Sequence, residues 1–64
     1  NPTKDILNLD SRLLLDVEVY DMMGKLVIRN ESVKTIDLSK MIPGIYNISI
    51  IYDKYRFNKR VAKQ

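Results

Sequence analysis

"KMIPGIYNIS", residues 40–49, places a Pro-Gly pair directly before a tyrosine and a run of alternating apolar and polar residues. The chain of 64 residues contains two prolines and two glycines, and one of each stands here. Pro43 holds φ at about −65° and cannot donate a hydrogen bond to a sheet, so it ends the preceding segment. Gly44 accepts the backbone conformation of a reversal. The pair therefore predicts a corner from which a central strand starts.

The strand expected after this corner, and a second one earlier in the chain, both show a period of two. In "IYNISIIYD", residues 45–53, one face carries Tyr46, Ile48, Ile50 and Tyr52. In "LLLDVEVYD", residues 13–21, one face carries Leu13, Leu15, Val17 and Val19. Strict alternation over this length predicts half-buried β-strands, because successive side chains point to opposite faces.

Two hairpins are predicted from turn residues. Asp21 and Gly24 suit the ends of a type I turn closed by a left-handed glycine, which gives a bulged hairpin. We then expect Leu26 and Ile28 to share one face of the returning strand, with Val27 on the other.

A second turn is predicted at "DKYR", residues 53–56. The chain then returns as "YRFNKRVAK", residues 55–63, with Phe57 and Val61 pointing inward.

Two shorter strands complete the set. They are "DILNL", residues 5–9, and "KTIDLS", residues 34–39, which follows a loop at "NESV", residues 30–33. About six to seven short strands with frequent turn signals and no convincing helix predict an all-β antiparallel sandwich or small barrel. We expect residues 1–64 to be a single domain, and the opening without an initiator methionine favours a piece of a longer chain.

The net charge of +3 is unevenly distributed. Residues 1–53 hold six basic and all eight acidic side chains, a balance of −2, whereas residues 54–64 hold five basic side chains and no acid. A lysine- and arginine-rich last strand can serve as a protected sheet edge or as a surface for a partner. In isolation, edge strands of so small a sandwich could also pair into dimers.

The residue types exclude much of catalysis. The chain has no histidine and no cysteine, which removes Ser-His and Cys-His nucleophilic pairs, thiolate metal sites and disulfides. Asp16 and Glu18 point to the same outward strand face, which predicts a solvated face and not an acid–base pair. Asp21 and Asp37 stand at turn entries, where a carboxylate accepts backbone N–H bonds. We therefore expect no enzyme, no metal and no cofactor.

The basic composition of residues 54–64 also makes nucleic-acid binding a function to consider. Tyr55 and Phe57 alternate with Lys54 and Arg56, the ingredients of a stacking and phosphate-binding surface. Alternation, however, places both aromatic rings on the face of Val61, where we expect them to be buried. Buried rings cannot stack on bases, so we expect no nucleic-acid partner.

Four segments, "NPTKDILNL", "VEVYDMMGKLV", "TIDLSKMIPGIYNISI" and "KRVAK", together resemble the type A C-terminal sorting domain of the type IX (Por) secretion system of Bacteroidetes. The resemblance covers essentially the whole chain. The matching positions that define the fold are Pro2, Asp21, Gly24, Lys25, Asp37, Pro43, Gly44 and Tyr46, with Asn1, Leu7, Tyr20, Ile36, Leu38 and Ser39 alongside. At the end of the chain Lys59, Arg60, Val61 and Lys63 match the basic strand of the family. The family's glycine in the final hairpin is replaced here by "DKYR".

The resemblance implies a non-catalytic, immunoglobulin-like sandwich at the end of a larger exported protein. Such a domain passes through the periplasm after Sec export and is read by the type IX translocon in the outer membrane. In many members a sortase-type peptidase then removes the domain, and the N-terminal cargo is secreted or attached to the cell surface. Our hypothesis is that Lys59, Arg60, Val61 and Lys63, next to the Pro43–Tyr46 corner, form the recognised patch. Strand addition and attraction to an acidic receptor would suit such an edge.

One alternative remains open at this point. An accessory immunoglobulin-like module that binds carbohydrate or braces an extracellular enzyme would present an exposed aromatic platform. Its candidate residues are Tyr20, Tyr52 and Tyr55.

Overall fold

A computed structural model describes the backbone of residues 2–3 and 5–64 and the side chains from residue 5 onward. This part of the chain forms seven strands and no helix. The strands are β1 (Pro2–Thr3), β2 (Ile6–Asn8), β3 (Leu15–Tyr20), β4 (Leu26–Val33), β5 (Thr35–Asp37), β6 (Gly44–Tyr52) and β7 (Tyr55–Lys63).

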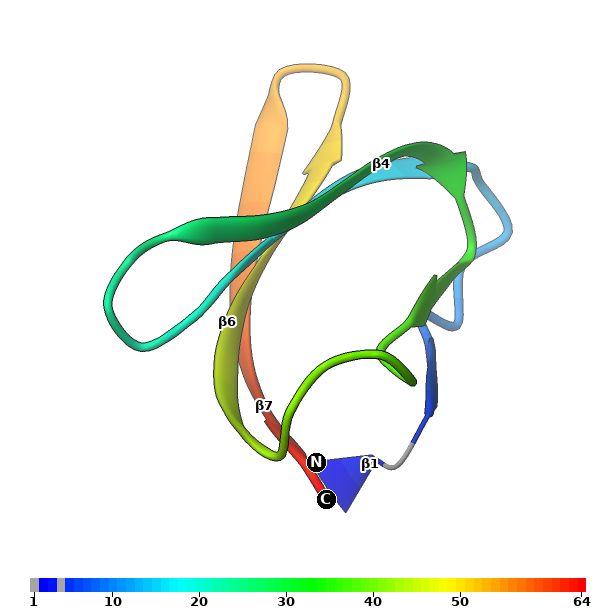
Figure 1. Cartoon of the computed structure of the whole chain (residues 1–64). Helices are drawn as coiled ribbons and strands as arrows, with labels where there is room; N and C mark the ends of the chain where they lie inside the picture. The colour runs from blue at the N-terminus through cyan, green and yellow to red at the C-terminus, as the bar shows by residue number, and fades with distance from the viewer. Residues whose placement is uncertain (1, 4) are drawn as a thin grey trace.

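The strands form two sheets. The larger has the order β1-β7-β6-β3-β4, and the smaller pairs β2 with β5. All pairs are antiparallel except β1 with β7, which run parallel with Pro2 opposite Ala62. In Figure 1 the small pair lies across from β6 and β7, and β1 lies beside the end of β7. The protein is thus a small immunoglobulin-like β-sandwich, which confirms the predicted all-β class.

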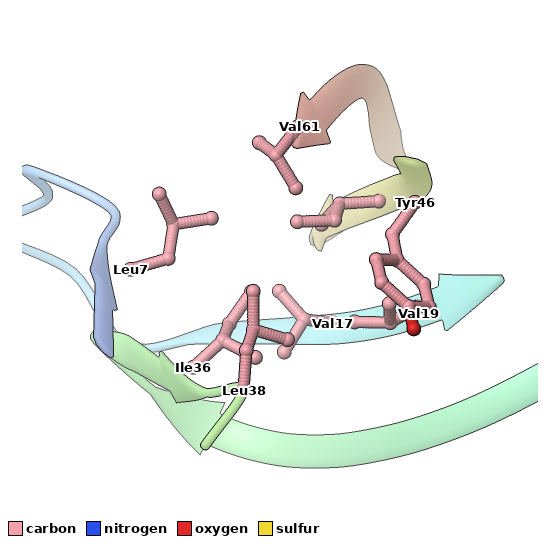
Figure 2. Packing of buried hydrophobic residues seen from close by; sticks show 8 residues of the cluster. Leu7, Val17, Val19, Ile36, Leu38, Tyr46 and Val61 are labelled. Carbon is pink, nitrogen blue, oxygen red and sulfur yellow. The ribbon is translucent and has the colours of Figure 1, made fainter. Parts of the chain in front are cut away.

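The core lies between the two sheets. Its side chains come from both layers, as Figure 2 shows: Leu7, Ile36 and Leu38 on the side of the small sheet, and Val17, Val19, Tyr46 and Val61 on the large one. Ile48 of β6 completes the core. Burying about eight such side chains contributes roughly 1.5–3 kcal/mol each. The alternation in β3 and β6 is confirmed at the centre of each strand, although Leu13 is half exposed.

The Pro-Gly corner leads into β6 as predicted. Tyr46 is buried in the core, and its hydroxyl donates a hydrogen bond of 2.6 Å to the carbonyl of Ile42, just before Pro43. This bond ties the start of β6 to the loop that precedes it. Gly44 has φ of +159°, close to extended, so the strand begins at the glycine itself.

Both predicted turns are present. At the β3–β4 turn the N–H of Gly24 donates to the carbonyl of Asp21, and Gly24 has φ of +84°, the left-handed conformation that glycine adopts without strain. At the β6–β7 turn Tyr52 pairs with Tyr55, so Asp53 and Lys54 form a two-residue loop. Asp53 takes φ of +55°, and aspartate is among the residues that tolerate this region.

Two predictions for β4 are wrong. The segment "NESV" is not a loop but the second half of β4, and Leu26 and Ile28 do not share a face. The register of β4 against β3 shifts twice, once beside Tyr20 and once beyond Val17, so β4 carries an extra residue at each place. Such bulges bend a strand, and β4 curves accordingly away from the large sheet toward β5 (Figure 1).

The prediction that Phe57 points into the core is also wrong, as is the burial of Tyr55. Phe57 lies on the same face as Val61, yet it is 62% exposed while Val61 is 1% exposed. The small sheet has strands of three residues each, whereas β6 and β7 have nine each. The covering layer is therefore too short to reach the outer half of this hairpin.

Candidate recognition surface

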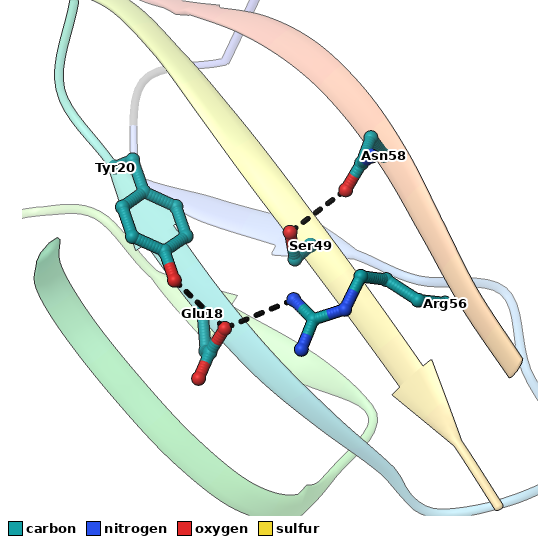
Figure 3. Close-up of polar contacts among 5 residues, drawn as sticks. All are labelled: Glu18, Tyr20, Ser49, Arg56 and Asn58. Atoms are coloured by element: carbon teal, nitrogen blue, oxygen red, sulfur yellow. Dashed lines mark hydrogen bonds and ion pairs between the residues drawn. The ribbon is translucent and has the colours of Figure 1, made fainter. Parts of the chain in front are cut away.

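The face of the large sheet that points away from the core carries a polar cluster. The side chain of Glu18 on β3 accepts a hydrogen bond of 2.8 Å from the Tyr20 hydroxyl, and the same oxygen, Oε1, lies 3.1 Å from Nη1 of Arg56 on β7. Figure 3 shows the three side chains converging above β6. Glu18 and Tyr20 reach each other because residues two apart on a strand share a face.

These contacts shift the titration of both groups. The pKa of Glu18 is lowered, first by the hydrogen bond from Tyr20 and then by the one from Arg56. The pKa of Tyr20 is raised because its hydroxyl donates to the Glu18 carboxylate. Both shifts favour the states that these groups ordinarily have at neutral pH, an ionised Glu18 and a neutral Tyr20, which suits a structural cross-strand link and not an acid–base pair.

Two further pairs continue this polar face toward the last strand. The hydroxyl of Ser49 donates to the side-chain oxygen of Asn58 at 2.7 Å (Figure 3), and Nε of Arg60 donates to that of Asn47 at 3.4 Å. Both pairs join β6 to β7 at positions that are directly opposite in register. Side-chain hydrogen bonds thus connect neighbouring strands on the outer face of the large sheet.

The two carboxylates predicted at turn entries serve their turns. Oδ1 of Asp21 accepts hydrogen bonds from the N–H groups of Met23 and Lys25. Oδ1 of Asp37 accepts one from the N–H of Ser39, and hydrogen bonds from the Ser39 side chain and backbone lower the pKa of Asp37. Both predicted roles are confirmed.

The proposed basic patch lies along the last five residues of β7. Lys63 is opposite Gly44, Arg60 is opposite Asn47, and Lys59 is opposite Ile48, so the cations do lie beside the strand that starts at the corner. Lys59 and Arg60 are exposed and Lys63 is partly exposed. Val61 is 1% exposed and belongs to the core, so its side chain is not available to a partner. Val61 therefore supports the patch from below.

The described residues were also searched for a metal site, for a pocket and for a membrane-spanning helix. Within residues 2–3 and 5–64 no three carboxylates gather closely enough to hold a metal ion. A shallow polar hollow beside β4 is lined by Arg29, Asn30 and Glu31. In the part of the chain that the structure describes, no helix is long and apolar enough to cross a membrane.

The comparisons with known proteins decide the family. The family model of the secretion system C-terminal sorting domain matches residues 1–64, the full length of the sequence. The chain belongs to this family of type IX sorting domains. Searches of the curated proteins and of the solved structures found no match. Membership makes the chain a C-terminal sorting signal for type IX secretion, which takes a cargo to the cell surface or beyond.

The positions on which the resemblance to sorting domains was based have identifiable structural roles. Asp21 and Gly24 build the β3–β4 turn, Asp37 caps the turn after β5, and Tyr46 anchors the corner. Pro2 lies in β1, at the outer edge of the large sheet. Lys25 donates its backbone N–H to Asp21, and nothing in the structure explains why its side chain is a lysine. Asn1 lies outside the described residues.

Some features of the sorting domain are not visible to sequence reasoning. Glu18 and Arg56 meet although they are 38 residues apart in the sequence, and only the i, i+2 spacing of Glu18 and Tyr20 indicated any part of this cluster. Nucleic-acid binding was excluded because Tyr55 and Phe57 were expected to be buried. Both rings are exposed, so that argument does not hold. Of the alternative platform residues, Tyr52 and Tyr55 are exposed and Tyr20 is partly buried.

Proposed function

We propose that residues 1–64 act as one folded, non-catalytic secretion signal at the C-terminal end of a larger exported protein. The cargo precedes the domain, enters the periplasm by Sec export and crosses the outer membrane through the type IX translocon. The observation that carries this proposal is the match of the sorting-domain family over the full length of the sequence. The compact sandwich supports a signal that is read as a folded surface.

We further propose that the translocon reads the basic end of β7. Lys59, Arg60 and Lys63 form the patch, and Val61 holds their strand against the core. Side chains alternate along a strand, so Lys59 and Lys63 flank one face of the edge and Arg60 the other. A receptor with acidic groups would be attracted to both sides of this edge, and salt would weaken that attraction.

Removal of the domain by a sortase-type peptidase and attachment of the cargo to anionic lipopolysaccharide complete the proposed path. The position of β1 supports such a cut. β1 is the first strand of the domain, so a cut before it would leave both sheets and the core intact.

Secretion of a fusion protein tests the patch. A passenger with a Sec signal is joined to residues 1–64 and expressed in a type IX-competent bacterium. We expect the combined substitutions Lys59→Gln, Arg60→Gln and Lys63→Gln to reduce the secreted fraction at least tenfold. The passenger should then accumulate in the periplasm.

A matched control removes the same charge elsewhere. Arg12→Gln, Lys34→Gln and Lys40→Gln also delete one arginine and two lysines, all exposed. The control should be secreted normally, and equal secretion of both variants would refute the patch. The mass of the secreted passenger shows whether the domain has been removed, and labelling of intact cells shows attachment to the surface.

A further inference from the structure

The β6–β7 hairpin carries an apolar surface that the core does not use. Its core-facing side continues from Tyr46 and Val61 through Ile48 and Lys59 to two outer cross-strand pairs. We call these outer residues, Ile50, Tyr52, Tyr55 and Phe57, the aromatic tip. Tyr46 is 4% exposed at one end of this face, whereas Tyr52, Tyr55 and Phe57 are 44%, 55% and 62% exposed at the other.

The aromatic tip is exposed because the small sheet stops short of it. A strand of nine residues is about 30 Å long and one of three residues about 10 Å, since each residue adds roughly 3.3 Å. Figure 1 shows the outer half of the hairpin projecting past the other strands. Ile50 still packs against the core, so the tip is a continuation of the core face and not a separate cluster.

The edge of the large sheet next to this tip is open. β7 pairs with β6 on one side and, on the other, with β1 only at Ala62 and Lys63. No described strand pairs with the remaining seven residues of that side, from Tyr55 to Val61. An unpaired edge of this length can accept an added strand from another chain, whose main-chain groups complete the ladder.

The charges of the edge decide which strand it accepts. Arg56 and Arg60 lie on the outer face, Lys59 lies on the core-facing side, and Lys54 lies at the turn. Asp53, directly before Lys54 in the sequence, is the one acidic residue from position 53 to position 64. Arg56 is paired with Glu18 across β6, so the cations that leave this edge positively charged are Arg60, Lys59 and Lys54. Two copies joined edge to edge would bring like charges together, which is unfavourable in cross-strand pairs. The occupant is therefore acidic, and a second copy of this chain is disfavoured.

We propose that the open edge of β7 and the aromatic tip bind an extended segment of a partner protein in which acidic and apolar side chains alternate. Once added as a strand, the segment packs its apolar side chains beside Tyr55 and Phe57. Its acidic side chains then lie on the outer face, on the side of Arg60. This inference rests on the proposed function in one respect, namely that β7 is the strand that a partner reads.

Peptide binding to the purified domain tests the inference apart from secretion. The probe is a fluorescent peptide of about nine residues, the length of β7, in which glutamate alternates with valine. We expect saturable binding by fluorescence anisotropy that weakens as salt is raised. A peptide with lysine in place of glutamate should not bind. N-methylation of alternate backbone amides, which blocks hydrogen bonding by the added strand, should abolish binding.

Substitutions locate the site on the domain. Tyr55→Ser combined with Phe57→Ser should weaken peptide binding at least tenfold, and both side chains are exposed, so the fold should persist in a thermal melt. Met22→Ser combined with Met23→Ser is the matched control, because these exposed apolar residues lie at the turn of the other hairpin. The control should bind like the unmodified domain.

Four outcomes would overturn the inference, and the first three are no binding of the acidic peptide, binding unaffected by the tip substitutions, and tip-dependent binding of oligosaccharides instead of the peptide. Tip-dependent dimerisation in sedimentation experiments would overturn it as well. If the peptide fails to bind while the basic-patch variant still blocks secretion, the inference fails and the proposed function stands. If the peptide binds while the basic-patch variant is secreted normally, the patch assignment fails and the docking surface stands.

Discussion

At the scale of single residues, the β3–β4 turn depends on the left-handed backbone of Gly24. Apart from the glycine and its two chain neighbours, no atom lies within 4 Å of the position where a Cβ would stand, so crowding by the rest of the fold is not what requires glycine. The requirement comes from φ of +84°, where an L-residue places its Cβ too close to the backbone.

Gly24→Ala should therefore lower the free energy of unfolding by about 1 kcal/mol. Gly24→Asn should cost less, because asparagine tolerates this conformation. Met23→Ala, one residue earlier at a side chain that is 91% exposed, is the control and should change little. Urea denaturation measures all three, and an alanine variant as stable as the parent would contradict this explanation.

Tyr46 joins the corner to the core through its hydroxyl. Tyr46→Phe removes the bond to the Ile42 carbonyl and keeps the buried ring. We expect a loss of about 1 kcal/mol, the usual net contribution of such a bond. In a domain of this size that lowers the melting temperature by about 4–8 °C. Tyr52→Phe, at an exposed ring of the same strand, should leave the melting temperature unchanged.

At the scale of elements, the Glu18 cluster links β3 to β7 across β6. The lowered pKa of Glu18 means that its ionised form is favoured in the folded state. Its contribution to stability is present above the unfolded value of about 4.5 and is lost as the pH falls through the lower folded value. For Tyr20 the raised pKa gives the opposite sense, a contribution present below 10 and lost as the pH rises through the folded value.

Glu18→Gln should therefore lower the melting temperature at pH 7, with the difference from the parent shrinking below about pH 4.5. Asp37 also has a lowered pKa and remains in both proteins, so part of the acid sensitivity should persist in the variant. Melting curves between about pH 3 and pH 8 measure the effect. A difference that is constant over this range would show that the ionisation of Glu18 does not matter.

The sequence predicted those turns and strands that are encoded by residues close together along the chain. The turn at Asp21 and Gly24 is encoded in four consecutive residues, and the alternation in β3 and β6 identifies Val17, Val19, Tyr46 and Ile48 as inward-facing. Alternation shows which face of the sheet a side chain points to, but not whether another sheet covers that face at this point. Phe57 was therefore wrongly placed in the core. The two bulges of β4 depend on how that strand bends toward β5, and no local pattern marks them.

The candidate site was predictable in part for the same reason. The cations of the last strand are visible in the sequence, and their register beside the corner follows from the hairpin. That Val61 is buried while Lys59 and Lys63 on the same face reach solvent depends on how the sheets overlap. The pairing of β1 with β7 joins the two ends of the chain, and the sequence contains no signal for it.

At the scale of the whole molecule, the last strand is both structure and signal. Removing residues 59–64 deletes Val61 from the core, five residues from β7 and both partners of β1. Loss of Val61 alone costs about 2 kcal/mol, against a total stability of roughly 5 kcal/mol for a marginal domain. We therefore expect the truncated chain to be unfolded by circular dichroism.

The triple glutamine variant of Lys59, Arg60 and Lys63 keeps the apolar core and should remain folded. A cooperative melt of the truncated chain would contradict this prediction. If the chain is unfolded, a secretion defect after truncation would report the loss of the fold and not the loss of the basic patch. Substitutions, not deletions, separate the two roles of β7.

The parallel pairing of β1 with β7 has a mechanical consequence. A pulling force applied between residue 2 and residue 63 loads both residue pairs that join these strands at the same time, in shear, because residue 2 begins β1 and residue 63 ends the parallel strand β7. Once this short clasp opens, β7 can peel from β6 one residue pair after another, starting opposite Gly44. A domain tethered in this way resists a pull on both ends first at the β1–β7 pairing, and its last hairpin separates only after that pairing is broken.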